Sequence, residues 1–284
     1  MSRFRTAGLL LAMALVATAV GTPPAAADLF FASSGNEFGT INPVTGAITT
    51  LGTVSTDTGN PIFGMGFSNG GLYGLDGNAT TPTPPLAHLF RINPANGATT
   101  DLGSTGQTAV GATTNGAGVL FASTLNFSPP SPSTFYRVSP PSPVATTIGG
   151  TGFISDGLLA FDGAGNLFES ARSTPSGSGP DNLYRVDPAT GASTLIGSIG
   201  FSQIFTGAFD HGILYAFPGT GPQVIEINTS TGAGTVVSTY SLPHGDTIDA
   251  AAAVPEPGSV VLLGLGLTGL CGYAWRRTRS QAVA

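Results

Sequence analysis

The chain has 284 residues, of which only 8% are charged and 41% are hydrophobic, and it contains 42 glycines and 22 prolines. The hydrophobic content excludes a disordered segment driven by charge. Residues 28–253 hold four arginines, no lysine and fourteen acidic residues. A nucleic-acid partner is therefore not expected, because neutralising phosphates requires basic patches.

The first 27 residues have the pattern of a secretory signal peptide. Two arginines precede an apolar run from 7 to 20, and a proline pair then interrupts it. Ala25 and Ala27 place small residues where signal peptidase cleaves, so we expect the cut after Ala27. An uncleaved membrane anchor is the alternative.

The segment from 28 to 253 repeats itself five times. One phrase begins at His88 as HLFRINPANGATTDLG and at Asn182 as NLYRVDPATGASTLIG, and its other copies begin at Glu37, Thr134 and Val224. Each copy follows a short Leu-aromatic phrase, such as LFFASS or NLFESA, and in the later copies a glycine- and alanine-rich phrase precedes that. A period of roughly 40–50 residues is typical of the blades of a β-propeller.

Each repeat predicts four short strands joined by turns. In NPVTG and DPATG, Asn or Asp starts the turn, Pro presets φ, and Gly accepts a positive φ. The first repeat lacks its first strand, and the segment from Asp246 to Val254 resembles an isolated first strand. We therefore predict an all-β fold, a five-bladed propeller closed by pairing of 246–254 with 29–33. An open β-solenoid and a β-sandwich are the alternatives.

The body offers little catalytic chemistry. Its three histidines, His88, His211 and His244, share no ligand-like spacing, and the only cysteine, Cys271, lies outside it. No phosphate-binding glycine loop or serine nucleophile motif is present. We predict no catalytic residue, no metal site and no cofactor.

Two groups of charged residues leave alternatives open. The first acid group consists of residues near the starts of the predicted first strands, at the axial mouth, where they would suit calcium. The second acid group consists of residues that directly follow a predicted strand, and these are expected to hydrogen-bond to the backbone of their own turns. Arginines recur at one register, either as a ring for an anionic ligand or, as we favour, paired with neighbouring acids and stacked on aromatics. The residues concerned are Asp156, Asp246 and Asp249 for the first acid group, Asp76, Asp162 and Asp210 for the second, and Arg91, Arg137 and Arg185 for the arginines.

The C-terminus has its own organisation. Residues 254–257 are Val-Pro-Glu-Pro, which we expect to be an extended linker because proline excludes helix there. Residues 258–275 are apolar or small throughout and predict a transmembrane helix. The basic tail 276–284 is expected on the cytoplasmic side, which leaves the body outside the inner membrane.

This ending resembles the PEP-CTERM sorting signal of Gram-negative bacteria. The residues that carry the resemblance are Val254, Pro255, Glu256, Pro257, Trp275, Arg276 and Arg277. The resemblance implies recognition by an exosortase and cleavage near Pro-Glu-Pro. An ordinary anchor that is never processed is the alternative.

We therefore expect a protein that is exported, anchored in transit in the inner membrane, and then placed at the cell surface or in the extracellular matrix. Signal peptidase and an exosortase are the expected processing partners. The propeller is expected to be a non-enzymatic binding or structural module, and the resemblance implies a link to exopolysaccharide or the envelope. The alternative is a glycan-active hydrolase or lyase with its site at the propeller axis.

Overall fold

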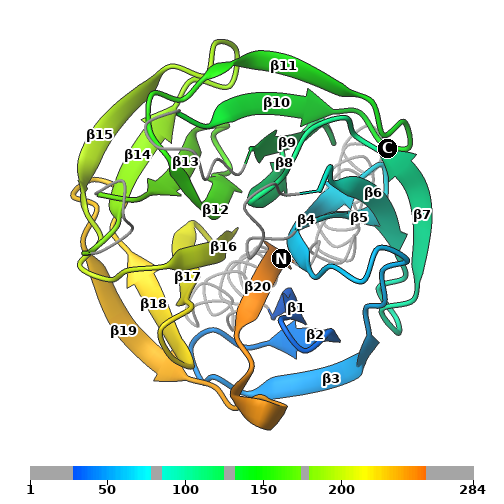
Figure 1. Cartoon of the computed structure of the whole chain (residues 1–284). Coiled ribbons are helices and arrows are strands. Elements are labelled where there is room, and N and C mark those ends of the chain that lie inside the picture. The colour runs from blue at the N-terminus through cyan, green and yellow to red at the C-terminus, as the bar shows by residue number, and fades with distance from the viewer. Residues whose placement is uncertain (1–27, 78–84, 125–131, 174–178, 254–284) are drawn as a thin grey trace, which may run out of the picture.

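The computed structural model describes residues 28–77, 85–124, 132–173 and 179–253. Within these residues twenty strands form five antiparallel sheets of four strands each, arranged as blades around one axis (Figure 1). The five-bladed propeller predicted from the repeats is confirmed, and the open solenoid and the sandwich are excluded.

The strands of each blade run outward from the axis in the order that the repeat predicts. Blade 1 consists of β20 (Ile248–Ala253), β1 (Leu29–Ser33), β2 (Glu37–Ile41) and β3 (Ile48–Thr53). Blade 2 consists of β4 (Ile62–Ser68), β5 (Gly71–Asp76), β6 (His88–Ile92) and β7 (Thr99–Ser104). Blade 3 consists of β8 (Gly111–Thr114), β9 (Leu120–Ser123), β10 (Thr134–Val138) and β11 (Ala145–Gly150). Blade 4 consists of β12 (Ser155–Phe161), β13 (Leu167–Ala171), β14 (Asn182–Val186) and β15 (Ser193–Ser198). Blade 5 consists of β16 (Ile204–Asp210), β17 (Ile213–Pro218), β18 (Gln223–Ile227) and β19 (Gly234–Thr239).

The inner strands are rich in glycine and alanine because they approach one another around the axis. A Cβ atom built on Gly111 of β8 would lie 1.7 Å from the carbonyl oxygen of Gly157 in β12. One built on Gly64 of β4 would lie 2.0 Å from the backbone nitrogen of Ala112. Larger residues at these positions would force the neighbouring inner strands apart.

The turns between third and fourth strands form as their sequences predict. In blade 1 the side chain of Asn42 accepts hydrogen bonds from the backbone N–H groups of Val44 and Thr45, at 3.2 and 3.0 Å. Gly46 then adopts a φ of +73°, which favours glycine. This turn packs on the neighbouring blade, since a Cβ on Gly46 would lie 1.9 Å from the carbonyl oxygen of Thr239.

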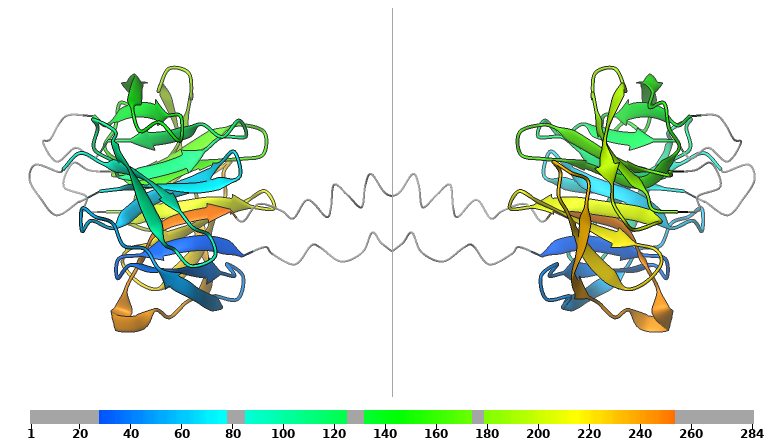
Figure 2. Two further views of the ribbon diagram at one scale, coloured as in Figure 1. Left: turned by 90° about the vertical axis from the view of Figure 1, so that its right-hand side faces the viewer. Right: turned by 90° about the vertical axis from the view of Figure 1, so that its left-hand side faces the viewer.

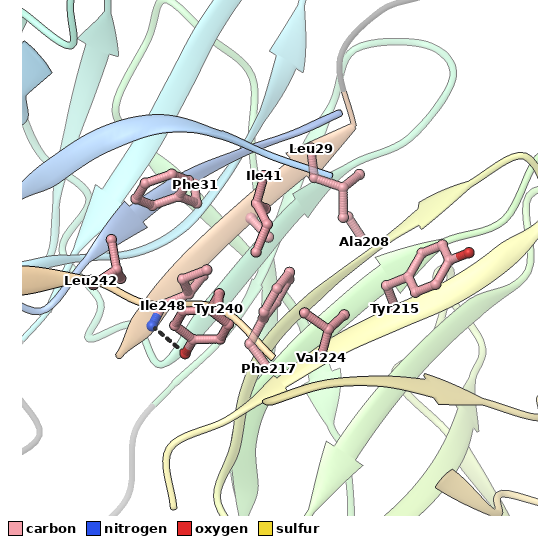
Figure 3. Packing of buried hydrophobic residues seen from close by; sticks show 11 residues of the cluster. Leu29, Phe31, Ile41, Ala208, Tyr215, Phe217, Val224, Tyr240, Leu242 and Ile248 are labelled. Carbon is pink, nitrogen blue, oxygen red and sulfur yellow. Dashed lines mark hydrogen bonds between the residues drawn. The ribbon is translucent and has the colours of Figure 1, made fainter. Parts of the chain in front are cut away.

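The two ends of the body close the ring. Strand β20 pairs antiparallel with β1, with Leu29 opposite Ala253, as predicted. Five apolar clusters fill the five gaps between neighbouring blades. The cluster at the closure joins Leu29 and Phe31 of β1 to Phe217 of β17, and there the Ile248 N–H donates to the Tyr240 hydroxyl at 3.3 Å (Figure 3).

The predicted signal peptide and C-terminal helix lie outside the described residues. Within the part of the chain that the structure describes, no helix is long and apolar enough to cross a membrane. The boundaries proposed for the two ends therefore stay predictions.

Candidate functional site

The propeller has two distinct faces, which follow from the direction of its inner strands. We call "loop face" the face where inner strands begin and where second and third strands are joined. We call "terminus face" the opposite one, where β1 begins and β20 ends (Figure 2). The turns between first and second strands, and between third and fourth strands, also lie on the terminus face.

At the terminus face the axis opens into a cavity of about 260 Å³ lined by all five inner strands. Phe67, Phe161 and Phe209 contribute partly exposed rings, and β20 contributes residues 251–253. The polar side chains of the lining are those of Thr113 and Thr114. Among the described residues no acid or histidine lines this mouth. Asp156, Asp246 and Asp249 lie at the opposite, loop-face end of the inner strands, near the starts of β12 and β20, and they form no group that could hold a metal ion.

A pair of buried acids lies instead at the loop-face end of blade 4. Asp156 and Asp181 are 3% and 1% exposed, and the guanidinium Nε of Arg172 lies 2.8 Å from a carboxylate oxygen of Asp156. Burial raises the pKa of Asp181, and the adjacent negative charge of Asp156 raises it further. Asp181 also accepts a hydrogen bond from the Ile204 N–H at 2.8 Å, which ties blade 4 to the inner strand of blade 5.

Two other acids on the loop face also have structural partners. Asp76 is fully buried at the end of β5 and accepts hydrogen bonds from the His88 N–H and the Thr58 hydroxyl. The sequence predicts that Asp76 bonds to its own turn, but it does not, because residue 76 still belongs to strand β5. Asp249 accepts from the Thr247 hydroxyl at 2.9 Å, and burial raises its pKa to about 6.

The remaining acids of the second group behave largely as predicted. Asp162 accepts hydrogen bonds from the backbone N–H groups of Ala164 and Asn166, at 2.9 and 2.8 Å, so it stabilises its own turn. In the corresponding turn of blade 5, between β16 and β17, a carboxylate oxygen of Asp210 lies 2.7 Å from Nδ1 of the adjacent His211.

Glu169 is an acid that sequence reasoning missed. It is fully buried on β13 between Leu167 and Ala171, which belong to the apolar cluster between blades 3 and 4. Burial raises its pKa to about 7, and the nearby hydroxyls of Ser123 and Ser155 lower it only in part. Among the described residues, neither carboxylate oxygen makes a hydrogen bond of normal geometry. The available signal was an acid in a phrase that is otherwise apolar or small, NLFESA.

The recurring arginines are exposed and face the terminus side of the third strands. Arg91, Arg137 and Arg185 occupy one register, which holds Thr40 in blade 1 and Glu226 in blade 5. Within the described residues none of the three forms an ion pair, and the Arg185 side chain instead donates to the Asn166 side-chain oxygen. The favoured pairing with neighbouring acids is therefore wrong for the described structure, even though Asp187 lines the same pocket as Arg185.

Matching pockets lie beside two of these arginines. The pocket of blade 2 has a volume of about 370 Å³ and contains Arg91, Asn93 and Thr100. That of blade 4 has a volume of about 440 Å³ and contains Arg185 and Thr194 at the equivalent places, with the acid Asp187 where blade 2 has Asn93. Each pocket lies between the turn that joins the first and second strands of its blade and the turn that joins the third and fourth strands. Since both kinds of turn lie on the terminus face, both pockets open toward that face.

The histidines do not come together. His88 starts β6 and lies 2.8 Å from Asp101, His211 lies in the hairpin after β16, and His244 lies in a short turn before β20. In the described ranges no group of three or more His, Cys, Asp or Glu side chains could hold a metal ion.

The predicted sorting residues from Val254 to Arg277, and the predicted cleavage residues Ala25 and Ala27, lie outside the described residues. The structure does show where the tail begins, directly after β20. Residues 253–279 match the PEP-CTERM protein-sorting motif. The PEP-CTERM motif marks an exported protein that is processed by an exosortase, so the resemblance noted in the sequence is confirmed.

Other comparisons describe the body only loosely. A comparison with curated proteins finds no match. Among solved structures, a chain of the nidogen/laminin complex is similar at 12% identity and a TM-score of 0.49, over 81% of this chain and 99% of that one. A PQQ-bound aldose sugar dehydrogenase from Streptomyces coelicolor follows at 15% identity and a TM-score of 0.48, over 76% and 81% of the two chains. A luciferin-regenerating enzyme follows at 10% identity and a TM-score of 0.46, over 80% of each chain. At such values none of these proteins indicates what this chain binds or does.

Proposed function

We propose that the propeller is a non-enzymatic binding or structural module that the PEP-CTERM tail delivers to the cell surface or the extracellular matrix. The observation that carries this proposal is the sorting motif at 253–279, which starts where the closing strand ends. Because the tail follows the closed ring directly, the cleaved product would be a complete propeller. Exopolysaccharide or another envelope polymer is the ligand class that we propose for it.

The chemistry of the body supports a binding role. Its buried acids have structural partners or lie among apolar side chains, as Asp181 and Glu169 illustrate. The axial cavity is lined by apolar side chains, backbone and two threonines, whereas glycan hydrolysis requires paired carboxylates beside the substrate.

We place the binding surface on the loop face. The proline-rich sequences at 81–85, 128–133 and 173–180 all connect a second strand to a third strand, and those strands end and begin on this face. Loops on a rigid scaffold are common carriers of recognition. Their repetition in blades 2, 3 and 4 suits a polymer, which offers the same group several times.

One observation favours an enzyme as the second candidate. Asp156 and Asp181 form a carboxyl pair beside Arg172, and a buried carboxyl group with a raised pKa, as at Asp181, also occurs in active sites. Both groups are almost fully buried, so a substrate would require blade 4 to open. Asp156→Asn should abolish any glycan cleavage if this candidate holds, and should leave polymer binding unchanged if the first one does.

Two experiments test the proposal. C-terminal mass spectrometry on protein from the native host should find chains that end near Pro255–Pro257, and a mature surface protein that still ends at Ala284 would overturn the sorting step. Exopolysaccharide from the same host should then retain the mature protein on a column without being depolymerised. Loss of retention when the segment 173–180 is replaced by glycine and serine would place the site on the loop face.

A further inference from the structure

We propose that the terminus face is a membrane-docking surface, which contacts anionic lipid headgroups while the tail is still in place. This inference rests on the proposed function, because it requires the tail to be inserted in a membrane. It adds a second surface to the molecule, opposite the loop face, with a different kind of partner.

The first argument is the position of the chain ends. Leu29 begins β1 opposite Ala253, which ends β20, so both ends of the body lie side by side on the terminus face (Figure 2). Only the four residues 254–257 separate Ala253 from the apolar run that begins at Gly258. Four extended residues span at most about 14 Å, so a membrane that holds the run must lie close to this face.

The second argument is the chemistry at the centre of this face. The axial mouth presents the partly exposed rings of Phe67, Phe161 and Phe209, and its lining includes residues 251–253, from which the tail departs. Aromatic rings are favourable in the interfacial region of a bilayer. The membrane anchor would therefore bring this mouth to the headgroup layer.

The third argument is the set of three arginines at one register of the third strands in blades 2, 3 and 4. Arg91, Arg137 and Arg185 are exposed without an ion pair in the described structure, and the pockets beside Arg91 and Arg185 open toward the same face. A guanidinium group has the donor geometry that recognises phosphate. The pocket beside Arg91 contains no acid and is thus suited to a lipid phosphate that the tail brings within reach, whereas the pocket beside Arg185 also contains Asp187.

The fourth argument is the uneven distribution of charge between the two faces. Seven acids and one arginine lie at the loop face: Glu37, Asp57, Asp76, Asp156, Asp181, Asp246, Asp249 and Arg172. Five acids and three arginines lie at the terminus face: Asp28, Asp162, Asp187, Asp210, Glu226, Arg91, Arg137 and Arg185. An anionic bilayer acts over a Debye length of about 8–10 Å, so it favours the less acidic face.

Two labels in blade 5 test this orientation. In the full chain, Cys271→Ala removes the only cysteine, and a fluorophore is then attached at Ser230→Cys or at Ser241→Cys. Both serines are exposed, Ser230 in a turn of the terminus face and Ser241 on the loop face. The protein is reconstituted in vesicles of phosphatidylethanolamine and phosphatidylglycerol that carry a headgroup spin-label quencher.

The label at position 230 should be quenched several-fold more strongly than the label at 241, because the faces are separated by roughly 20 Å, the length of an inner strand. Equal quenching, or stronger quenching at 241, would overturn the proposed orientation. Vesicle flotation separates the two proposals: a chain that does not float has no inserted tail, which overturns the sorting mechanism and with it this inference.

The arginines are tested in the same assay. Replacing Arg91, Arg137 and Arg185 by glutamine should reduce quenching at position 230 about as much as replacing all phosphatidylglycerol by phosphatidylcholine. Glu226→Gln, at the same register in blade 5, is the matched control and should not reduce it. If the triple variant is quenched like the parent in both vesicle types, the arginines do not bind lipid phosphate.

Discussion

Replacing Glu169 by glutamine should stabilise the propeller at alkaline pH and leave its stability almost unchanged at pH 5. In the folded protein, burial raises the pKa of Glu169 from 4.5 to about 7. The folded state therefore holds a proton that the unfolded state has already lost between these two pH values. The free energy of unfolding therefore falls as the pH rises through this window, and the whole of this loss is present above pH 7.

The size of the effect follows from the pKa difference. One pKa unit corresponds to about 1.4 kcal/mol, so ionising Glu169 costs the fold roughly 3 kcal/mol at pH 8. Glutamine has nearly the same shape and carries no charge at any pH, so it avoids this cost. In a domain of this size 1 kcal/mol shifts Tm by roughly 2–4 °C, which predicts a gain of about 6–12 °C at pH 8.

The assay is thermal unfolding of residues 28–253 at several pH values between 5 and 8, followed by circular dichroism. Asp249, whose pKa burial raises to about 6, contributes a pH dependence of the same sign, so the informative quantity is the difference between parent and variant. Glu226→Gln is the control, since Glu226 is exposed on β18 and should change little. If Glu169→Gln and the parent lose stability equally between pH 5 and 8, the carboxyl group is not buried as described.

Three further predictions concern the ring and the tail. Ending the body at Leu242 removes β20 and exposes the edge of β1, so the product should melt far below residues 28–253 in calorimetry; equal melting temperatures would show that β20 does not close the ring. Gly111→Ala should lower the free energy of unfolding by about 1–3 kcal/mol in urea titrations, because the new Cβ atom would collide with the next inner strand. Gly116→Ala is the control and should change the free energy of unfolding little, because the space around Gly116 is open. Changing Pro255 and Pro257 together to alanine should let a helix extend into the linker, so that immunoblots of the membrane fraction show full-length protein accumulating; normal processing of this variant would contradict the role given to the prolines.

Local patterns in the sequence were sufficient to predict the architecture. The repeat predicted four strands per blade and five blades, and the missing first strand predicted the closure at β1 and β20. Turn sequences such as NPVTG predicted positive φ at Gly46. These features could be predicted because they depend on residues close together in the chain or on a period that every blade repeats.

The sorting function could also be predicted from the tail alone. Its motif, apolar run and arginines are consecutive, and the match at 253–279 confirmed the motif without any contribution from the fold. The tertiary structure adds that this tail leaves the ring beside the start of β1, on the face that carries the arginines.

Only the tertiary structure revealed how the charged side chains are arranged. Asp156 and Asp181 meet because β12 and the start of β14 lie in one blade, and Glu169 is buried because blade 3 covers β13. Arg91 and Arg137 form no ion pair within the described residues. Contacts between residues distant in the chain, and the burial that they cause, depend on how the blades pack, and a repeating local pattern does not encode that packing at single positions.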